Sequence, residues 1–171
     1  GAPSDHHADL GPLIDEASAN RYERLIQQAT SEGETVLAGQ RPAIGPLQNF
    51  AAPALYAVDD PSSTLIQTEL FAPIGILERF SDDAAAAVLA NQTRYGLSAS
   101  VYSQNGERAN RMARAIKAGT VWINCHNRLM AEAETGGYRE SGLGRLHGIE
   151  GLSDFLETKH VYQEFGQLPT G

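Results

Sequence analysis

The residue types best suited to covalent chemistry in this chain are Cys125 and His126, which are neighbours in the stretch TVWINCHN (120–127). A cysteine thiolate with an imidazole base can attack a carbonyl carbon, and Cys125 is the only cysteine. Neighbouring side chains at the end of a strand point in different directions, so adjacency alone does not pair them. A lone cysteine after a strand is more often a small buried apolar residue. We therefore do not expect Cys125 to be a nucleophile.

Two other stretches contain residues that could bind a ligand. GLGRLHG (142–148) is similar to a dinucleotide-binding glycine motif, but its third glycine comes one residue late and no strand directly precedes it. We interpret it as a loop whose backbone approaches another group closely. In QTELFAPIG (67–75), Glu69 stands two residues before Phe71. From the residues alone, this pair is a surface acid and a core aromatic.

Composition narrows the class of protein. The 171 residues include 13 basic and 21 acidic side chains, a net charge of −8, and no basic run, so we expect no nucleic-acid partner. No apolar run approaches the roughly 20 residues that cross a bilayer, and the first residues do not resemble a secretory signal. We expect no membrane partner and a cytoplasmic location. Adjacent His6 and His7 have no further ligand nearby, so we predict no metal site.

The elements that must position these residues alternate between helices and strands. A helix is predicted from an N-cap at Asp15 to a stop at Gly33. The elements predicted after it are strands at 34–39 and 54–58 separated by a loop or edge hairpin, a strand at 73–80, a helix at 82–92 capped by Ser81, a strand at 97–103, a helix at 106–119 ending at Gly119, and a strand at 120–124. This order predicts an α/β fold with a sheet of parallel βαβ units. Such sheets bind ligands beyond the carboxyl ends of their strands, which makes the loop after residue 124 a candidate site region.

The last part of the chain is predicted to contain a glycine-rich loop at 131–148, a short helix at 149–156 and a strand at 157–165. That strand has no evident partner in the chain. An unpaired strand is an edge, and edges favour pairing with another subunit.

Four stretches, in this order, resemble the C-terminal part of the NAD(P)-dependent aldehyde dehydrogenases: QTELFAPIG, NQTRYGLSASVYS, AGTVWINCHN and TGGYRESGLGRLHGIEGLSDFLETKHV. The corresponding family patterns are E-x-F-G-P, N-x-T-x-Y-G-L-A-A-x-V, A-G-x-V-W-I-N and P-F-G-G-x-K-x-S-G-x-G-R-E-x-G-x-x-G-L. The segment from Asp9 to Gln40 is also similar to the family's D-x-G-P-L-I segment and the helix after it. The resemblance implies that residues 1–156 are the C-terminal portion of the catalytic domain. It implies that residues 157–171 are an oligomerisation strand and tail, with homo-oligomers forming through 157–165.

The resemblance also implies the chemistry of the complete enzyme. An aldehyde is oxidised to a carboxylic acid with NAD or NADP, through a cysteine thiohemiacetal and a thioester. In the family the nucleophilic cysteine, the general-base glutamate and the Rossmann-like cofactor domain lie N-terminal to the D-x-G-P-L-I segment. This chain is therefore expected to be a fragment that holds no catalytic residue, binds no cofactor alone and is inactive by itself.

Several residues correspond to positions with family roles. Glu69 matches the glutamate that hydrogen-bonds the nicotinamide ribose hydroxyls, and Phe71 matches the aromatic residue that packs against the nicotinamide ring. The loop of Thr135, Gly136 and Gly137 matches the segment at the mouth of the aldehyde tunnel. The family has P-F before G-G where this chain has Glu134-Thr135, so the aromatic residue usual in that tunnel is absent.

Two other interpretations of the sequence stay open. The chain could be a non-catalytic module that uses this fold for oligomerisation or to cover the site of a partner. The change at Thr135 and the absence of the upstream half favour that interpretation. A stand-alone thiol hydrolase that uses Cys125 and His126 is the third, and it requires a thiol that reacts faster than free cysteine.

Overall fold

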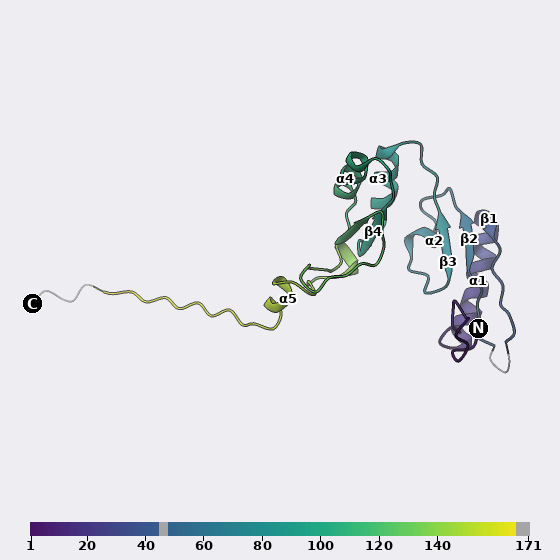
Figure 1. Cartoon of the computed structure of the whole chain (residues 1–171), viewed down its shortest axis with the longest axis horizontal. Coiled ribbons are helices and arrows are strands. Elements are labelled where there is room, and N and C mark those ends of the chain that lie inside the picture. Colours follow the sequence, from purple (N-terminus) through teal and green to yellow (C-terminus); the bar gives the residue numbers. More distant parts are fainter. Residues whose placement is uncertain (45–47, 167–171) are drawn as a thin grey trace, which may run out of the picture. The chain divides into compact units, whose positions relative to one another are not determined.

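The computed structural model describes residues 1–44 and 48–166, which belong to two compact units with a boundary between Arg94 and Tyr95 (Figure 1). The first unit begins with α1 (Glu16–Glu32), whose N-cap is Asp15 and whose C-cap is Gly33, as the sequence predicts. The Asp15 carboxylate accepts a hydrogen bond from the backbone N–H of Ser18 at 2.7 Å, which satisfies one of the free amides of the first turn.

A three-stranded sheet follows α1, with strand order β1-β2-β3. Its strands are β1 (Glu34–Leu37), β2 (Ala54–Ala57) and β3 (Ile74–Leu77), and the short helix α2 (Thr64–Gln67) connects the last two. β1 and β2 are antiparallel, whereas β2 and β3 are parallel with Ala54 opposite Ile74. The strands predicted at 34–39, 54–58 and 73–80 are therefore confirmed, each shorter than expected.

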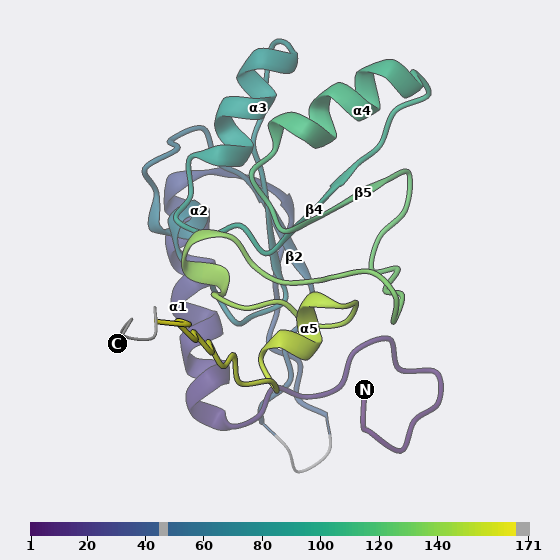
Figure 2. The ribbon, with the colours of Figure 1, turned by 90° about the vertical axis from the view of Figure 1, so that its left-hand side faces the viewer.

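The core of this unit lies between α1 and the sheet, where α1 lies along one face (Figure 2). Its buried residues come from α1, from β2 and the residue after it, and from α2: Ala29, Ala54, Tyr56, Val58 and Leu65. Apolar side chains are buried from both sides of β2, which is typical of a central strand with parallel pairing.

Helix α3 (Asp83–Asn91) confirms the helix predicted at 82–92, but its N-cap is Asp82 rather than Ser81. The Asp82 carboxylate accepts from the backbone N–H of Ala85 at 2.8 Å, and the Ser81 hydroxyl donates to Asp82 instead of to the helix. A carboxylate is the better cap because its charge also interacts favourably with the positive end of the helix dipole.

The second unit contains a parallel βαβ unit formed by β4 (Ser98–Val101), α4 (Gly106–Ala115) and β5 (Thr120–Ile123), with Ser98 opposite Thr120. This confirms the predicted crossover through the second helix. The strand β3 pairs with β2 in the first unit and β4 pairs with β5 in the second, so the crossover predicted through α3 would join strands of different units and stays a prediction.

Helix α4 ends earlier than the sequence predicts. The residue at its C-cap is Ile116, whose extended backbone and N–H bond to Met112 close the helix three residues before Gly119. Gly119 has another role, because its N–H donates to the carbonyl of Gly96 at 3.0 Å and so continues the chain into β5.

The C-terminal part contains a 3₁₀ turn, η1 (Arg139–Ser141), and a single-turn helix, α5 (Glu150–Ser153), which is shorter than the predicted 149–156. Residues 157–165 leave α5 as an extended segment that pairs with no described strand (Figure 1). The strand predicted there is absent from the single chain, since a strand requires a hydrogen-bonded neighbour. Its pairing with a second chain, like the predicted division at residue 156, stays a prediction. No helix in the described part of the chain is long and apolar enough to cross a membrane.

Candidate cofactor and substrate-loop residues

The two predicted cofactor-binding residues lie in the connection between α2 and β3. The residue between them, Leu70, packs against the core of the first unit, and the side chain of Phe71 is 69% exposed. The interpretation of Phe71 as a core residue is therefore wrong, because Leu70 is the residue that packs against the core. Leu70 therefore faces the core, whereas Phe71 is presented to solvent.

Phe71 has a left-handed backbone, with φ at 49°. A non-glycine residue in such a region costs about 1–3 kcal/mol, so neighbouring groups must hold it there. Nη2 of Arg21 donates to the carbonyl oxygen of Phe71 at 3.0 Å, and the guanidinium carbon lies 6.0 Å from the centre of the Phe71 ring. Nothing in the local spacing around Arg21 predicts this contact, because its partner is 50 residues away in the sequence.

The other predicted cofactor residue, Glu69, is exposed and makes no hydrogen bond or ion pair with any described residue. An ionised carboxylate has two oxygens that accept hydrogen bonds, and two neighbouring hydroxyls of a sugar can donate to both. The structure leaves the Glu69 carboxylate and the Phe71 ring exposed, and their roles as cofactor-binding residues stay predictions.

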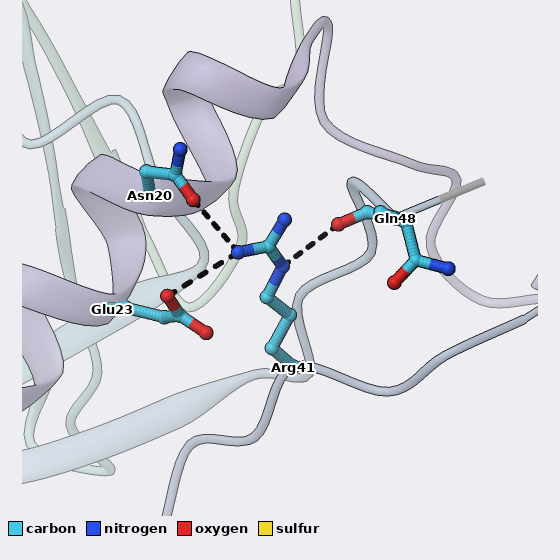
Figure 3. A network of polar contacts seen from close by, with 4 residues as sticks. All are labelled: Asn20, Glu23, Arg41 and Gln48. Carbon is cyan, nitrogen blue, oxygen red and sulfur yellow. Dashed lines mark hydrogen bonds and ion pairs between the residues drawn. The ribbon is translucent and has the colours of Figure 1, made fainter.

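Helix α1, which carries Arg21, is attached to the loop before β2 by the side chain of Arg41 (Figure 3). Nη1 of Arg41 donates to Oδ1 of Asn20 at 2.8 Å and lies 3.3 Å from a carboxylate oxygen of Glu23, and its Nε donates to the carbonyl of Gln48 at 2.7 Å. The buried Tyr22 hydroxyl adds a bond of 2.6 Å to the carbonyl of Ala52. These bonds orient the turn of α1 that faces Phe71.

In the second unit, the predicted substrate loop is fixed mainly by its backbone. Thr135 and Leu146 exchange two backbone hydrogen bonds of 2.8 and 2.7 Å. A methyl group on Gly119 would clash with the carbonyl oxygen of Gly136, so these two glycines are in direct backbone contact. Gly136 and Gly137 line an open pocket of about 270 Å³. The loop therefore borders a space that a small molecule could enter.

Glu134 and Thr135, which stand where the family pattern has P-F, make contacts that hold this loop. The Glu134 carboxylate accepts from the backbone N–H of Ile149 at 3.2 Å. Hydrogen bonds from backbone N–H groups, first its own and then those of Ile149 and Glu150, lower the pKa of Glu134. Oγ1 of Thr135 lies 3.4 Å from Nδ1 of His147. A polar side chain with a polar neighbour therefore takes the position that corresponds to the family's tunnel aromatic residue.

Cys125 and His126 do not form a pair. Cys125 is half-buried, and no hydrogen bond joins it to His126 among the described residues. Nδ1 of His126 lies instead 2.9 Å from Oγ of Ser100, and its ring packs edge-on against Trp122 at 5.1 Å. The geometry does not support the thiol hydrolase interpretation. Across residues 1–44 and 48–166, no three His, Cys, Asp or Glu side chains lie close enough to hold a metal ion.

Comparison with known proteins decides the family. The model of the aldehyde dehydrogenase family matches residues 1–161. This chain belongs to the aldehyde dehydrogenase family. The betaine aldehyde dehydrogenase of Brucella anthropi is 33% identical to it over 173 residues, which cover 98% of this chain and 35% of the relative. The corresponding enzyme of Bacillus subtilis is 36% identical over 162 residues, covering 92% and 33% of the two chains. This aldehyde dehydrogenase chain spans about a third of the length of these relatives.

Solved structures confirm the α/β aldehyde dehydrogenase fold. The betaine aldehyde dehydrogenase of Staphylococcus aureus in complex with NAD+ superposes with a TM-score of 0.85 at 35% identity, over 97% of this chain and 34% of that one. A double mutant of the same enzyme with NAD+ gives a TM-score of 0.86 at 36% identity, with the same coverage. The resemblance in the sequence analysis is thereby confirmed.

Proposed function

We propose that this chain is part of an NAD(P)+-dependent aldehyde dehydrogenase that oxidises an aldehyde to a carboxylic acid. Family membership over residues 1–161 and the similarity to solved NAD+ complexes support the proposal. The observation that carries it is the pairing of a free, exposed carboxylate at Glu69 with the outward-facing ring of Phe71. The nucleophilic cysteine and the general-base glutamate come from outside these 171 residues.

In this proposal the residues of the chain bind and orient, and do not form the covalent bond to the aldehyde. Nicotinamide supplies the hydride acceptor when it is bound. Glu69 accepts hydrogen bonds from the ribose hydroxyls, and Phe71 restricts the position of the flat ring. The loop of Thr135, Gly136 and Gly137 borders the entrance for the aldehyde. Thr135 stands where the family has an aromatic residue in the aldehyde tunnel. We therefore expect the enzyme to prefer different aldehydes from those of family members that have the aromatic residue.

We also propose that residues 157–165 add a strand to the sheet of a second copy of the protein. The segment exposes Val161, Tyr162 and Phe165 by 79%, 75% and 85%, respectively. Its backbone N–H and C=O groups form no hydrogen bond within the described part of the chain. Extended backbone with exposed apolar side chains is the type of surface that pairs with another sheet edge.

The test of the enzymatic function is NADH or NADPH production by the full-length protein with a panel of aldehydes. We expect Glu69→Gln to lower kcat/KM for the cofactor by about 10- to 100-fold, the effect of about 1.5–3 kcal/mol from hydrogen bonds to a charged group. Glu107→Gln is the matched control, because Glu107 is an exposed carboxylate on α4 in the other unit. A Glu69→Gln enzyme with unchanged kinetics would refute the role of Glu69. A protein that assembles but oxidises no aldehyde would favour the non-catalytic module.

A further inference from the structure

We propose that Arg21 is a positioning residue for Phe71, and that it acts on hydride transfer only through the orientation of that ring. The proposal rests on the proposed function, since Phe71 is there the residue that packs against nicotinamide. The sequence positions are 50 residues apart, and the contact exists only in the folded first unit.

Arg21 contacts both parts of Phe71 that determine where its ring points. Its Nη2 donates to the carbonyl oxygen at 3.0 Å, which restrains the backbone. Its guanidinium lies over the ring, 6.0 Å from the ring centre, at the limit of a cation–π contact. One side chain therefore restrains the backbone and the ring of the same residue.

Phe71 needs such support because little else holds it. Its ring is 69% exposed and its backbone is left-handed, whereas Leu70 on one side is packed in the core. On the other side, the N–H of Ile74 donates to the carbonyl of Ala72 at 2.8 Å, which restrains the entry into β3 but not the ring. Without Arg21 we expect Phe71 to relax towards the more populated extended region of backbone conformation.

Arg21 can provide this support because its own position is restrained. Asn20 and Glu23 are bonded to Arg41 (Figure 3). The hydroxyl of the buried Tyr22 is bonded to the carbonyl of Ala52. Arg21 forms no salt bridge within residues 1–44 and 48–166, and its charge interacts only electrostatically with the Asp15 carboxylate at the N-cap of the same helix. The bonds of Arg41 and Tyr22 hold the turn of α1 in place, and the Arg21 side chain extends from this turn to Phe71.

The first experiment measures kinetics of the full-length enzyme with Arg21→Gln, Arg21→Lys and the control Arg24→Gln. Arg24 is exposed on the next turn of α1 and has no hydrogen bond or ion pair with a described residue. We expect Arg21→Gln to lower kcat by about 10-fold, less than the roughly 100-fold that a misplacement of 1 Å can cost. We expect a larger primary isotope effect with aldehyde deuterated at the carbonyl carbon, and little change in KM for NAD+. Arg21→Lys keeps the charge and one donor, so it should recover part of the rate, and Arg24→Gln should resemble the wild type.

The second experiment is a double-mutant cycle with Phe71→Ala. If Arg21 acts only through the ring, Arg21→Gln has no further effect in the Phe71→Ala background. Additive losses in the double variant, or a wild-type rate and isotope effect in Arg21→Gln, would overturn the proposal. A loss of folded protein alone would lower kcat without changing the isotope effect.

Crystal structures of the wild-type protein and of Arg21→Gln separate this inference from the proposed function. We expect Phe71 to leave φ near 49° in the variant only. A variant with Phe71 unmoved would refute the positioning role even in an active enzyme. A wild type that oxidises no aldehyde would refute the proposed function, while a displaced Phe71 in the variant would still support the positioning role.

Discussion

Oγ of Ser100 in β4 lies 2.9 Å from Nδ1 of His126, just after β5. This contact joins two neighbouring parallel strands and engages Nδ1, one of the two ring nitrogens of the histidine adjacent to Cys125. A thiol becomes a strong nucleophile when a neighbouring cation or base favours the thiolate, and His126 is not bonded to the sulfur. Among the described residues, no hydrogen bond therefore pairs the thiol of Cys125 with His126.

Cys125→Ala should leave catalysis almost unchanged. We expect kcat of the full-length enzyme to stay within about two-fold of wild type, since the residue contributes no step to the reaction. The 171-residue chain itself should show no NAD(P)+-dependent aldehyde oxidation, and its thiol should react with iodoacetamide no faster than a free cysteine. Aldehyde turnover by the 171-residue chain that disappears with Cys125→Ala would contradict this prediction.

Tyr22→Phe should destabilise the first unit by about 0.5–1.5 kcal/mol, because it removes a buried hydrogen bond and leaves the carbonyl of Ala52 without it. The free energy of unfolding in urea measures the change. Tyr56→Phe is the matched control, since Tyr56 is equally buried but its hydroxyl has only a long contact of 3.4 Å with Thr30. Equal losses in both variants would show that the bond to Ala52 is not the cause.

Asp82→Asn should change how stability depends on pH. The hydrogen bond from the backbone N–H of Ala85, followed by that from Ser81, lowers the pKa of Asp82 from its usual 3.8. A lowered pKa in the folded state contributes stability that is present above 3.8 and is lost as the pH falls through the folded value. Asparagine also caps helices but does not titrate. As the pH is lowered below 3.8, the wild type should lose stability that the variant does not lose, so the difference between their urea midpoints should change in favour of the variant. A difference between the two midpoints that stays constant with pH would contradict this prediction.

Gly119→Ala should displace the substrate loop. The new methyl group would clash with the carbonyl oxygen of Gly136, so one of the two backbones must move, at a cost of about 1–3 kcal/mol or more. Gly106→Ala is the control, because a methyl group there would meet no atom within 4 Å. Urea unfolding should show a loss for Gly119→Ala and none for Gly106→Ala. Equal stability of both variants would mean that the Gly119–Gly136 contact is not tight in solution.

The 171-residue chain should self-associate through residues 157–165. Val161→Pro removes one backbone donor and should weaken strand pairing, whereas Val161→Ala keeps the donor and serves as the control. Sedimentation velocity measures the distribution of species. A monomeric wild-type chain would contradict the prediction, and association unaffected by Val161→Pro would place the interface elsewhere.

Local signals in the sequence were sufficient for most elements. Asp15 and Gly33 delimit α1 because a cap and a stop act within one turn of the helix. The alternation of strand and helix predicted the parallel unit of β4, α4 and β5, and the ordered motifs were sufficient for the family. The boundary error at Ser81 arose because the neighbouring Asp82 can also cap the helix, and the error at Gly119 arose because α4 ends three residues earlier, at Ile116.

The sequence by itself determined the elements and the family, since both depend on neighbours along the chain. Only the tertiary structure decided which side chains meet. Phe71 is exposed because no distant segment of the described first unit covers its ring. The contact of Phe71 with Arg21 and the backbone contact of Gly119 with Gly136 each join segments that are far apart in the sequence. Such contacts depend on how helices pack on sheets and how loops return to them, and no spacing within one segment encodes that geometry.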